Sequence, residues 1–225
     1  MADIPVASPR RSVLLLGATG LVGQECLRLL IEDDSCSRVV VLTRRPLPPQ
    51  QTALKVEEHV LDFAQLASCG AFFDVDQVIC ALGTTMRKTP SRDTYRSIDF
   101  EYPVTAAHMA LEKGARHYLV VSAVGANSRS PVFYNRIKGE VEDALKAMGF
   151  RSVTIAQPSV LIGERVEPRL SERIARRLSF VTPPAYRPVH ATSVAHALVH
   201  FAHLDEPGIR IIPNRDIERL GREPV

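Results

Sequence analysis

The chain has 225 residues, of which 45% are hydrophobic and only 12 are glycine, and this ordinary globular composition predicts one domain with its own core. The formal net charge is +3, with basic residues scattered among acidic ones, so we expect no nucleic acid and no membrane as a partner. No apolar run reaches the roughly 18 residues of a spanning helix, and the first residues lack the apolar centre of a secretory signal, which predicts a cytoplasmic protein.

Short runs rich in β-branched residues alternate along the chain with helical patterns. The runs predict strands at residues 12–17, 38–43, 57–62, 76–83, 116–122 and 152–158. Residues 21–32, 93–113 and 130–149 carry apolar side chains at helical intervals. Strands that are apolar on both faces are typical of a parallel sheet covered by helices on either side.

The alternation predicts an α/β fold of the Rossmann type, a doubly wound parallel sheet in a single domain. We expect residues 1–10 to form an N-terminal tail and residues 11–225 to form this domain, which includes a small C-terminal substrate region from about residue 157. Proline-rich loops interrupt the pattern, but neither is long enough to be a linker between domains.

The turn after the first predicted strand reads GATGLVG and opens a helix. Glycines at such a turn let the backbone approach a pyrophosphate, and the helix N-terminus offers free N–H groups. No Lys-Ser or Lys-Thr follows, which argues against a P-loop. A merely tight turn between strand and helix is the alternative interpretation. The residues expected to contact a dinucleotide here are Gly17, Thr19, Gly20, Leu21, Val22 and Gly23.

The end of the second strand indicates which dinucleotide is bound. An NAD site places Asp or Glu there to bind the ribose 2′-hydroxyl, whereas this chain has Arg44 and Arg45 after Thr43, which suit a 2′-phosphate. The pattern therefore favours NADP(H) as the cofactor, although two arginines could also simply begin a solvated loop. Asp62, after the third strand, is expected either to reach the adenine or to cap a helix.

A possible catalytic set follows the fifth strand. Ser122 stands at the strand's carboxyl end, where ligands of such folds bind, and Tyr134 follows on the next helix. Lys138 lies four residues after Tyr134, so the two side chains share one helical face with their Cβ atoms about 5–6 Å apart. The alternative is a surface tyrosine beside a lysine that pairs with Glu142.

Two other patterns bear on the class of protein. His196, His200 and His203 share a helix face, but no acidic residue occupies a metalloprotease position, so we expect solvated histidines and no metal. Val120 stands where a nucleophile elbow before Ser122 would need glycine, which argues against a hydrolase. The basic loop LGTTMRKTPSRD, after the fourth strand, either selects the substrate or is simply solvated.

The motifs GATGLVG, TRR, CALGTT, YLVVSAVGA, FYNRIKGEVE, QPSVLIGER and RPVHATSVAHAL together resemble the short-chain dehydrogenase/reductase superfamily, in its atypical branch related to the Tat-interactive oxidoreductase and its bacterial homologues. The resemblance implies a Rossmann-type fold, NADP(H) binding and Ser122, Tyr134 and Lys138 as the catalytic set. Its expected cofactor contacts include Leu82, Gly83, Tyr134 and Lys138, with Leu161 and Arg169 closing over the nicotinamide half. One departure is Asp99, which stands where members often carry Asn.

The sequence therefore predicts an NADP(H)-dependent oxidoreductase that acts on a small carbonyl or alcohol through Ser122, Tyr134 and Lys138. The alternative is an NADP(H)-binding regulatory or sensor protein whose catalysis is weak or vestigial. A small molecule is the expected substrate, and a protein partner or a homodimer is possible in either case. The sequence indicates neither the substrate's identity nor the direction of the reaction.

Overall fold

The computed structural model describes residues 10–51, 53–162, 183 and 186–221, and seven strands within them form one parallel sheet in the order β3-β2-β1-β4-β5-β6-β9. These strands are β1 (Arg11–Leu16), β2 (Cys36–Thr43), β3 (Val56–Val60), β4 (Gln77–Cys80), β5 (His117–Val121), β6 (Ser152–Gln157) and β9 (Gly208–Pro213). Two further short strands, β7 (Leu161–Ile162) and β8 (Val189–His190), pair with each other. The chain starts in the middle of the sheet, runs outward to β3 and then crosses to β4, so the topological switch point lies between β1 and β4.

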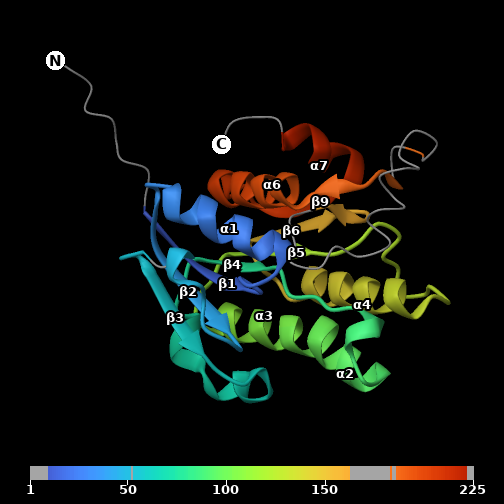
Figure 1. The fold of residues 1–225 in the computed structure, drawn as a ribbon, viewed down its shortest axis with the longest axis horizontal. Helices are drawn as coiled ribbons and strands as arrows, with labels where there is room; N and C mark the ends of the chain where they lie inside the picture. The colour runs from blue at the N-terminus through green and yellow to red at the C-terminus, as the bar shows by residue number, and fades with distance from the viewer. Residues whose placement is uncertain (1–9, 52, 163–182, 184–185, 222–225) are drawn as a thin grey trace.

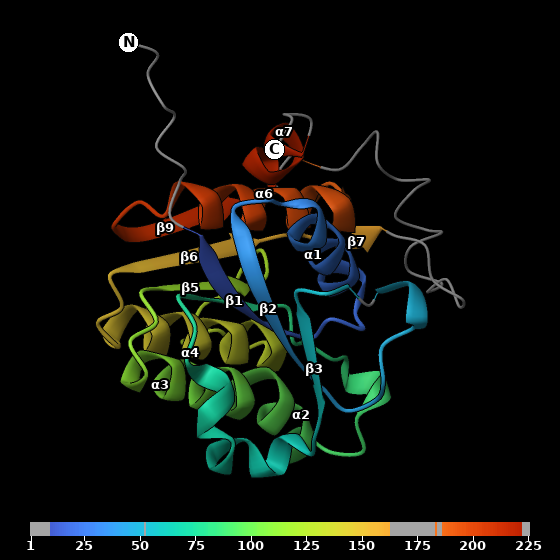
Figure 2. The same cartoon turned by 90° about the vertical axis from the view of Figure 1, so that its left-hand side faces the viewer.

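Helices cover both faces of the sheet (Figures 1 and 2). One face carries α1 (Leu21–Glu32), α6 (Ala191–Leu204) and α7 (Asn214–Leu220), and the other carries α2 (Arg92–Arg96), α3 (Tyr102–Glu112) and α4 (Phe133–Ala147). The connections contain short helical turns, namely η1 (Pro49–Gln51), η2 (Phe63–Ser68), η3 (Gly70–Phe73), η4 (Met86–Lys88) and the π-helix η5 (Ser97–Glu101). This arrangement confirms the predicted doubly wound Rossmann-type fold in a single domain.

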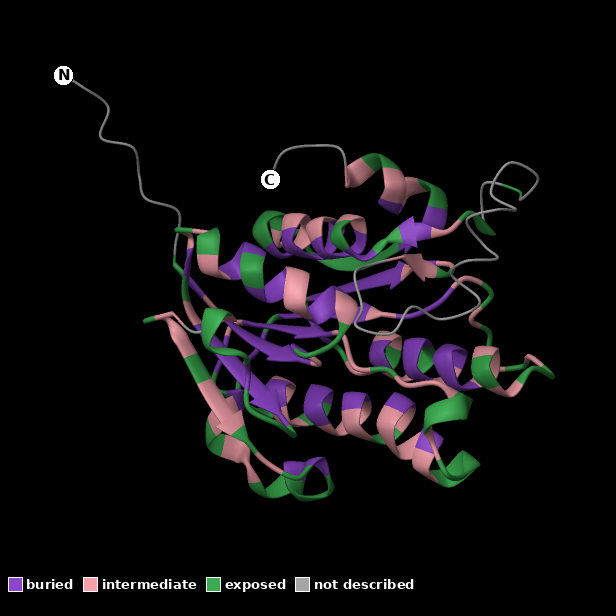
Figure 3. Cartoon of the chain, viewed as in Figure 1, coloured by how far each residue is buried: buried purple, intermediate pink, exposed green. Residues whose placement is uncertain are grey.

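The core is divided between the two faces by the alternation of side chains along each strand. Val13 and Leu15 of β1 pack toward α1 and α6, whereas Leu14 and Leu16 pack toward α3 and α4. All four are fully buried, and Figure 3 shows the central strands buried while the outer surfaces of the helices remain exposed. Apolar runs that bury both faces are therefore what made β1, β2 and β5 visible in the sequence.

Several elements differ from the sequence-based expectation, and β7, β8 and α7 are among those that were not predicted. Strand β9 was not predicted, and it lies at the edge of the sheet with Ile209 and Ile211 exposed, so its side chains do not follow the buried two-sided pattern. The helix expected over 93–113 is divided by the π-helix η5 into α2 and α3. Within the described ranges, no helix combines the length and the apolar character that crossing a membrane requires.

Candidate functional site

An elongated cleft lies at the carboxyl ends of the strands, at the switch point between β1 and β4. Its two parts have volumes of about 580 and 530 Å³ and share Gly20, Leu21 and residues 81–84. We call the part that includes Arg44 and Arg45 the arginine cavity, and the part that includes Tyr134 and Lys138 the tyrosine cavity. Ligands of open α/β sheets bind at this position.

The glycine turn forms the floor of the cleft, and each of its three glycines is needed for a different reason. Gly17 has φ +84°, and a Cβ there would lie 2.6 Å from the backbone of Ala81, so the turn requires glycine. A Cβ at Gly23 would lie 2.0 Å from the Gly17 carbonyl oxygen, because α1 packs closely against the turn. Gly20 lines both cavities, and its absent side chain leaves the backbone open to a ligand.

Helix α1 begins at this turn without a side-chain cap and with no acidic residue in its first turn. The first N–H groups of a helix have no partner within the helix, and together with the helix dipole they favour an anion. Thr19, Leu21 and Val22 of the same turn line the cleft, whereas Gly23 does not. These features fit a pyrophosphate, so the residues present match the predicted dinucleotide.

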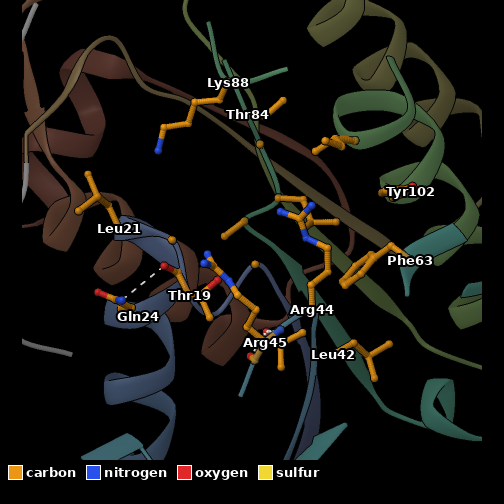
Figure 4. Close-up of a pocket in the computed structure, with 17 residues that line it drawn as sticks. Thr19, Leu21, Gln24, Leu42, Arg44, Arg45, Phe63, Thr84, Lys88 and Tyr102 are labelled. Atoms are coloured by element: carbon orange, nitrogen blue, oxygen red, sulfur yellow. Dashed lines mark hydrogen bonds between the residues drawn. The ribbon is translucent and has the colours of Figure 1, made fainter. Parts of the chain in front are cut away.

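The arginine cavity is lined by cations from two sides. Figure 4 shows the side chains of Arg44 and Arg45 extending into it from the end of β2, while Lys88 enters from the loop after β4. Thr43 is buried, and its hydroxyl donates to the Arg45 carbonyl oxygen at 2.8 Å, which fixes the backbone where the arginines leave the strand. Lys88 was missed as a site residue, although the basic loop that carries it was noted as a candidate.

The remaining predicted cofactor contacts divide into three groups. Leu82 and Gly83 line both cavities, and Leu161 lines the tyrosine cavity. Asp62 lies outside both linings and accepts a hydrogen bond from the Ala64 N–H at 3.0 Å as the N-cap of η2, which favours the capping interpretation. Arg169 lies outside the described residues.

The structure brings Ser122, Tyr134 and Lys138 together in the lining of the tyrosine cavity. Ser122 follows β5, and the other two lie one turn apart on α4. Helix α4 packs closely against the preceding loop at Gly139. A Cβ there would lie 2.1 Å from the Ser128 nitrogen, so this contact requires glycine. Tyr134 is 38% exposed, whereas Ser122 and Lys138 are only 4% and 6% exposed, so Tyr134 is the most accessible of the three.

Lys138 forms a buried ion pair that the sequence did not reveal. Its Nζ lies 2.9 Å from Asp99 Oδ1 and donates to the Val121 carbonyl oxygen at 3.4 Å. Burial by itself would lower the pKa of Lys138, but Asp99, together with Tyr134 and Cys80, outweighs that effect, and the pKa lies above its ordinary value. Lys138 is therefore a cation whose charge is largely offset by Asp99. It pairs with Asp99 and not with Glu142, the partner in the alternative interpretation.

Ser122 is engaged by a second buried carboxylate. Its hydroxyl donates to Glu142 Oε1 at 2.5 Å, and the same oxygen accepts from Gln157 Nε2 at 2.9 Å. Lys146 lies 3.2 Å from the other oxygen of Glu142 and supplies the countercharge. Because an ionised carboxylate only accepts hydrogen bonds, Ser122 presents its lone pairs to the cavity and must rotate its hydroxyl before it can donate to a ligand.

The histidines of α6 are not all solvated as expected, because His203 is exposed but His196 and His200 are half-buried and His196 Nδ1 is buried. Among the described residues no group of three His, Cys, Asp or Glu side chains could hold a metal ion. His203 lies 3.3 Å from the Arg11 guanidinium, and the His200 ring contacts Phe201 edge to face. The opposite side of this helix forms part of the core, where Ala195, Leu198, Val199 and Ala202 are buried.

Comparison with known proteins supports the dinucleotide interpretation of the cleft. A family model described as NAD(P)H-binding matches residues 17–203. Protein HTATIP2 of Rattus norvegicus is 30% identical over 221 residues, which cover 95% of this chain and 90% of the relative. Protein FMP52, mitochondrial, of Candida albicans is 30% identical over 201 residues, which cover 85% of this chain and 87% of the relative.

A solved structure shows the same fold. The Bordetella bronchiseptica enzyme WbmG in complex with NAD aligns with a TM-score of 0.66 at 14% sequence identity, over 93% of this chain and 74% of that chain. The relatives confirm the predicted resemblance to the Tat-interactive oxidoreductase branch, and the structural match confirms the Rossmann-type architecture.

The expectation of a cytoplasmic protein is wrong. FMP52 relatives from several fungi, among them Candida albicans and Aspergillus niger, are named mitochondrial, and they are 30% and 33% identical to this chain. The prediction rested on the absence of a spanning helix and of a secretory signal. Import into mitochondria requires neither feature, so their absence could not decide the compartment.

Proposed function

The chain belongs to the NAD(P)H-binding family, and we propose that it is an NADP(H)-dependent oxidoreductase of the short-chain dehydrogenase/reductase type that acts on a small carbonyl or alcohol. One observation carries the proposal: Ser122, Tyr134 and Lys138 meet in a cavity that is continuous with the glycine turn. An accessible phenol, a hydroxyl and an ammonium at one end of a dinucleotide cleft are the groups that carbonyl reduction needs.

The cofactor would be held along the whole cleft. The turn at Gly20 and the N-terminus of α1 would bind the pyrophosphate, and Arg44 and Arg45 would bind a ribose 2′-phosphate. Lys138 and Leu161 would contact the nicotinamide half. When bound, the nicotinamide supplies or accepts a hydride at the carbon of the substrate.

Tyr134 is the group that would move the proton. In reduction its Oη–H bond breaks, and the proton goes to the carbonyl oxygen as that carbonyl's carbon gains a hydride, so the product is an alcohol. An ordinary tyrosine titrates near pH 10, and a neighbouring cation such as Lys138 stabilises the phenolate that remains. Ser122, with its hydroxyl rotated away from Glu142, would hold the substrate oxygen beside Tyr134.

The buried partners of Lys138 and Ser122 also fit a second function, that of an NADP(H)-binding regulatory protein. Asp99 offsets the charge of Lys138, and Glu142 accepts a hydrogen bond from the Ser122 hydroxyl, so Lys138 and Ser122 both have partners without a substrate. An NADP(H)-binding regulatory protein would need the cleft but not these reactive groups. The buried pairs would then serve stability alone.

The test is oxidation of NADPH by the purified protein against a panel of aldehydes, ketones and quinones, with Tyr134→Phe assayed beside it. Contaminating reductases are recognised because the substitution leaves their rates unchanged. Turnover that depends on Tyr134 supports the oxidoreductase. Tight NADPH binding without any Tyr134-dependent turnover makes the regulatory protein the better account.

A further inference from the structure

A π-helix delivers one acidic side chain into the tyrosine cavity. Helix α2 continues through η5 into α3 without a break, and the widened turn falls at Ser97–Glu101. Single π turns inside α-helices occur frequently at functional sites. Asp99 lies on the inner side of this turn, is only 1% exposed and lines the cavity beside Lys138.

Asp99 Oδ2 accepts a hydrogen bond, whereas Oδ1 is held by an ion pair that lacks hydrogen-bond geometry. Oδ2 accepts the Thr84 N–H at 2.8 Å, which ties η5 to the loop after β4, and Oδ1 lies 2.9 Å from Lys138 Nζ. Among the described residues that line the tyrosine cavity, Lys138 is the one cation and Asp99 the one anion. The two charges cancel where Tyr134 must exchange its proton.

The other titratable groups around Tyr134 do not restore a net charge. The Tyr95 ring of α2 lies 6.4 Å from the Tyr134 ring, and burial, Asp99 and Tyr134 hold the pKa of Tyr95 above its ordinary value, so Tyr95 stays neutral. Burial also raises the pKa of the Cys80 thiol of β4, which interacts electrostatically with Lys138. Lys138 and Asp99 therefore dominate the local field.

The other charged groups of α4 and α2 near Tyr134 have partners of their own. Glu142, one turn beyond Lys138, has Lys146 at 3.2 Å. The guanidinium groups of Arg92 and Arg136 lie over the ring of Phe133, at 5.2 and 5.6 Å from its centroid.

We propose that Asp99 is a positioning residue that offsets the charge of Lys138, so that Tyr134 stays protonated to a higher pH and can donate its proton in carbonyl reduction over a wider pH range. The inference rests on the proposed function for its catalytic consequence. An uncompensated lysine beside a phenol would favour the phenolate, which accepts a proton and serves alcohol oxidation. Asp99 thus sets the upper limit of the pH range in which Tyr134 can donate a proton.

The proposal is tested first without cofactor or substrate, by the near-ultraviolet absorbance of tyrosinate during a pH titration. Subtracting the titration of Tyr134→Phe from that of the unmodified protein isolates Tyr134. The same subtraction is made with Asp99→Asn as the background. We expect Tyr134 to titrate about 1–3 pH units lower in that background, the range typical of a cation within about 4–6 Å. Titration at the same pH in both backgrounds overturns the proposal.

Two further variants keep this measurement decisive. Asp93→Asn removes an exposed carboxylate from the same helical segment and should leave the titration of Tyr134 unchanged. Asp99→Ser replaces the carboxylate by a smaller neutral group and should shift the titration in the same direction as Asp99→Asn. A shift in the Asp93 variant, or opposite shifts in the two Asp99 variants, contradicts charge cancellation as the cause.

The kinetic measurement separates this inference from the proposed function. With a substrate from the carbonyl panel, the pH at which reduction falls to half should be about 1–3 units lower in Asp99→Asn than in the unmodified protein. Tyr134-dependent turnover with no such shift overturns the role of Asp99 and leaves the oxidoreductase standing. A tyrosinate shift with no Tyr134-dependent turnover in any variant supports the charge cancellation and overturns the oxidoreductase.

Discussion

Removal of Arg44 and Arg45 should abolish a preference for NADPH over NADH. Both side chains extend into the arginine cavity and both are exposed. A hydrogen bond to a charged group contributes about 1.5–3 kcal/mol, and solvent exposure places these two at or below the lower end. Two such contacts contribute at most about 3 kcal/mol, so we expect a preference of roughly 10- to 100-fold.

The assay is a fluorescence titration of each reduced cofactor, which yields the ratio of the Kd for NADH to the Kd for NADPH. Arg44→Ala and Arg45→Ala should each lose about half of the preference free energy, and the double variant should bring the ratio to about one. Arg28→Ala/Arg116→Ala is the matched control, because it removes two positive charges from residues outside both cavity linings. Equal affinity of the unmodified protein for both cofactors would refute the assignment of NADP(H), and so would an unchanged ratio in the Arg44/Arg45 double variant.

Three other expectations follow from the structure. Gly20→Val, at a position whose φ of −86° suits any residue, should abolish NADPH binding in the same titration while the circular-dichroism spectrum stays that of the folded protein. Lys138→Met leaves buried Asp99 without its cation and should lower the free energy of unfolding in urea by about 3–5 kcal/mol, whereas adding Asp99→Leu should recover much of the loss. Burial lowers the pKa of His117 to about 4, so His117 is neutral in the folded protein; stability should fall as the pH drops from about 6.5 toward 4, and His117→Gln should weaken that dependence in urea unfolding at several pH values.

The sequence predicted the buried strands, the glycine turn and the shared face of Tyr134 and Lys138, because each depends on residues close together in the chain. The buried strands could be recognised because both of their faces are apolar. The turn could be recognised because the positive φ at Gly17 and the close packing at Gly23 both require glycine. The spacing of Tyr134 and Lys138 fixes their shared face wherever α4 lies. The parallel sheet then places Ser122 at the same edge.

The pairings between distant segments could not be predicted in this way. Asp99 reaches Lys138 because a π turn replaces an ordinary helical turn, and the apolar periodicity of residues 93–113 does not reveal that turn. The Ser122–Glu142 hydrogen bond depends on how β5 and α4 pack, and on Gln157 from β6. Edge strand β9 lacked the buried pattern on which strand prediction relied.

The most direct test of the proposed function is the transfer of deuterium to the carbonyl carbon of a substrate from NADPH that carries deuterium at both C4 positions of the nicotinamide, detected by mass spectrometry of the alcohol product. The unmodified protein should form labelled alcohol, and Tyr134→Phe should form it ~10²–10⁴-fold more slowly, since general acid catalysis contributes that much. Its NADPH affinity should change little, because the substitution removes only a hydroxyl. Label transfer that proceeds at the full rate in Tyr134→Phe, or alcohol that carries no label, would contradict catalysis by Tyr134 at this cleft.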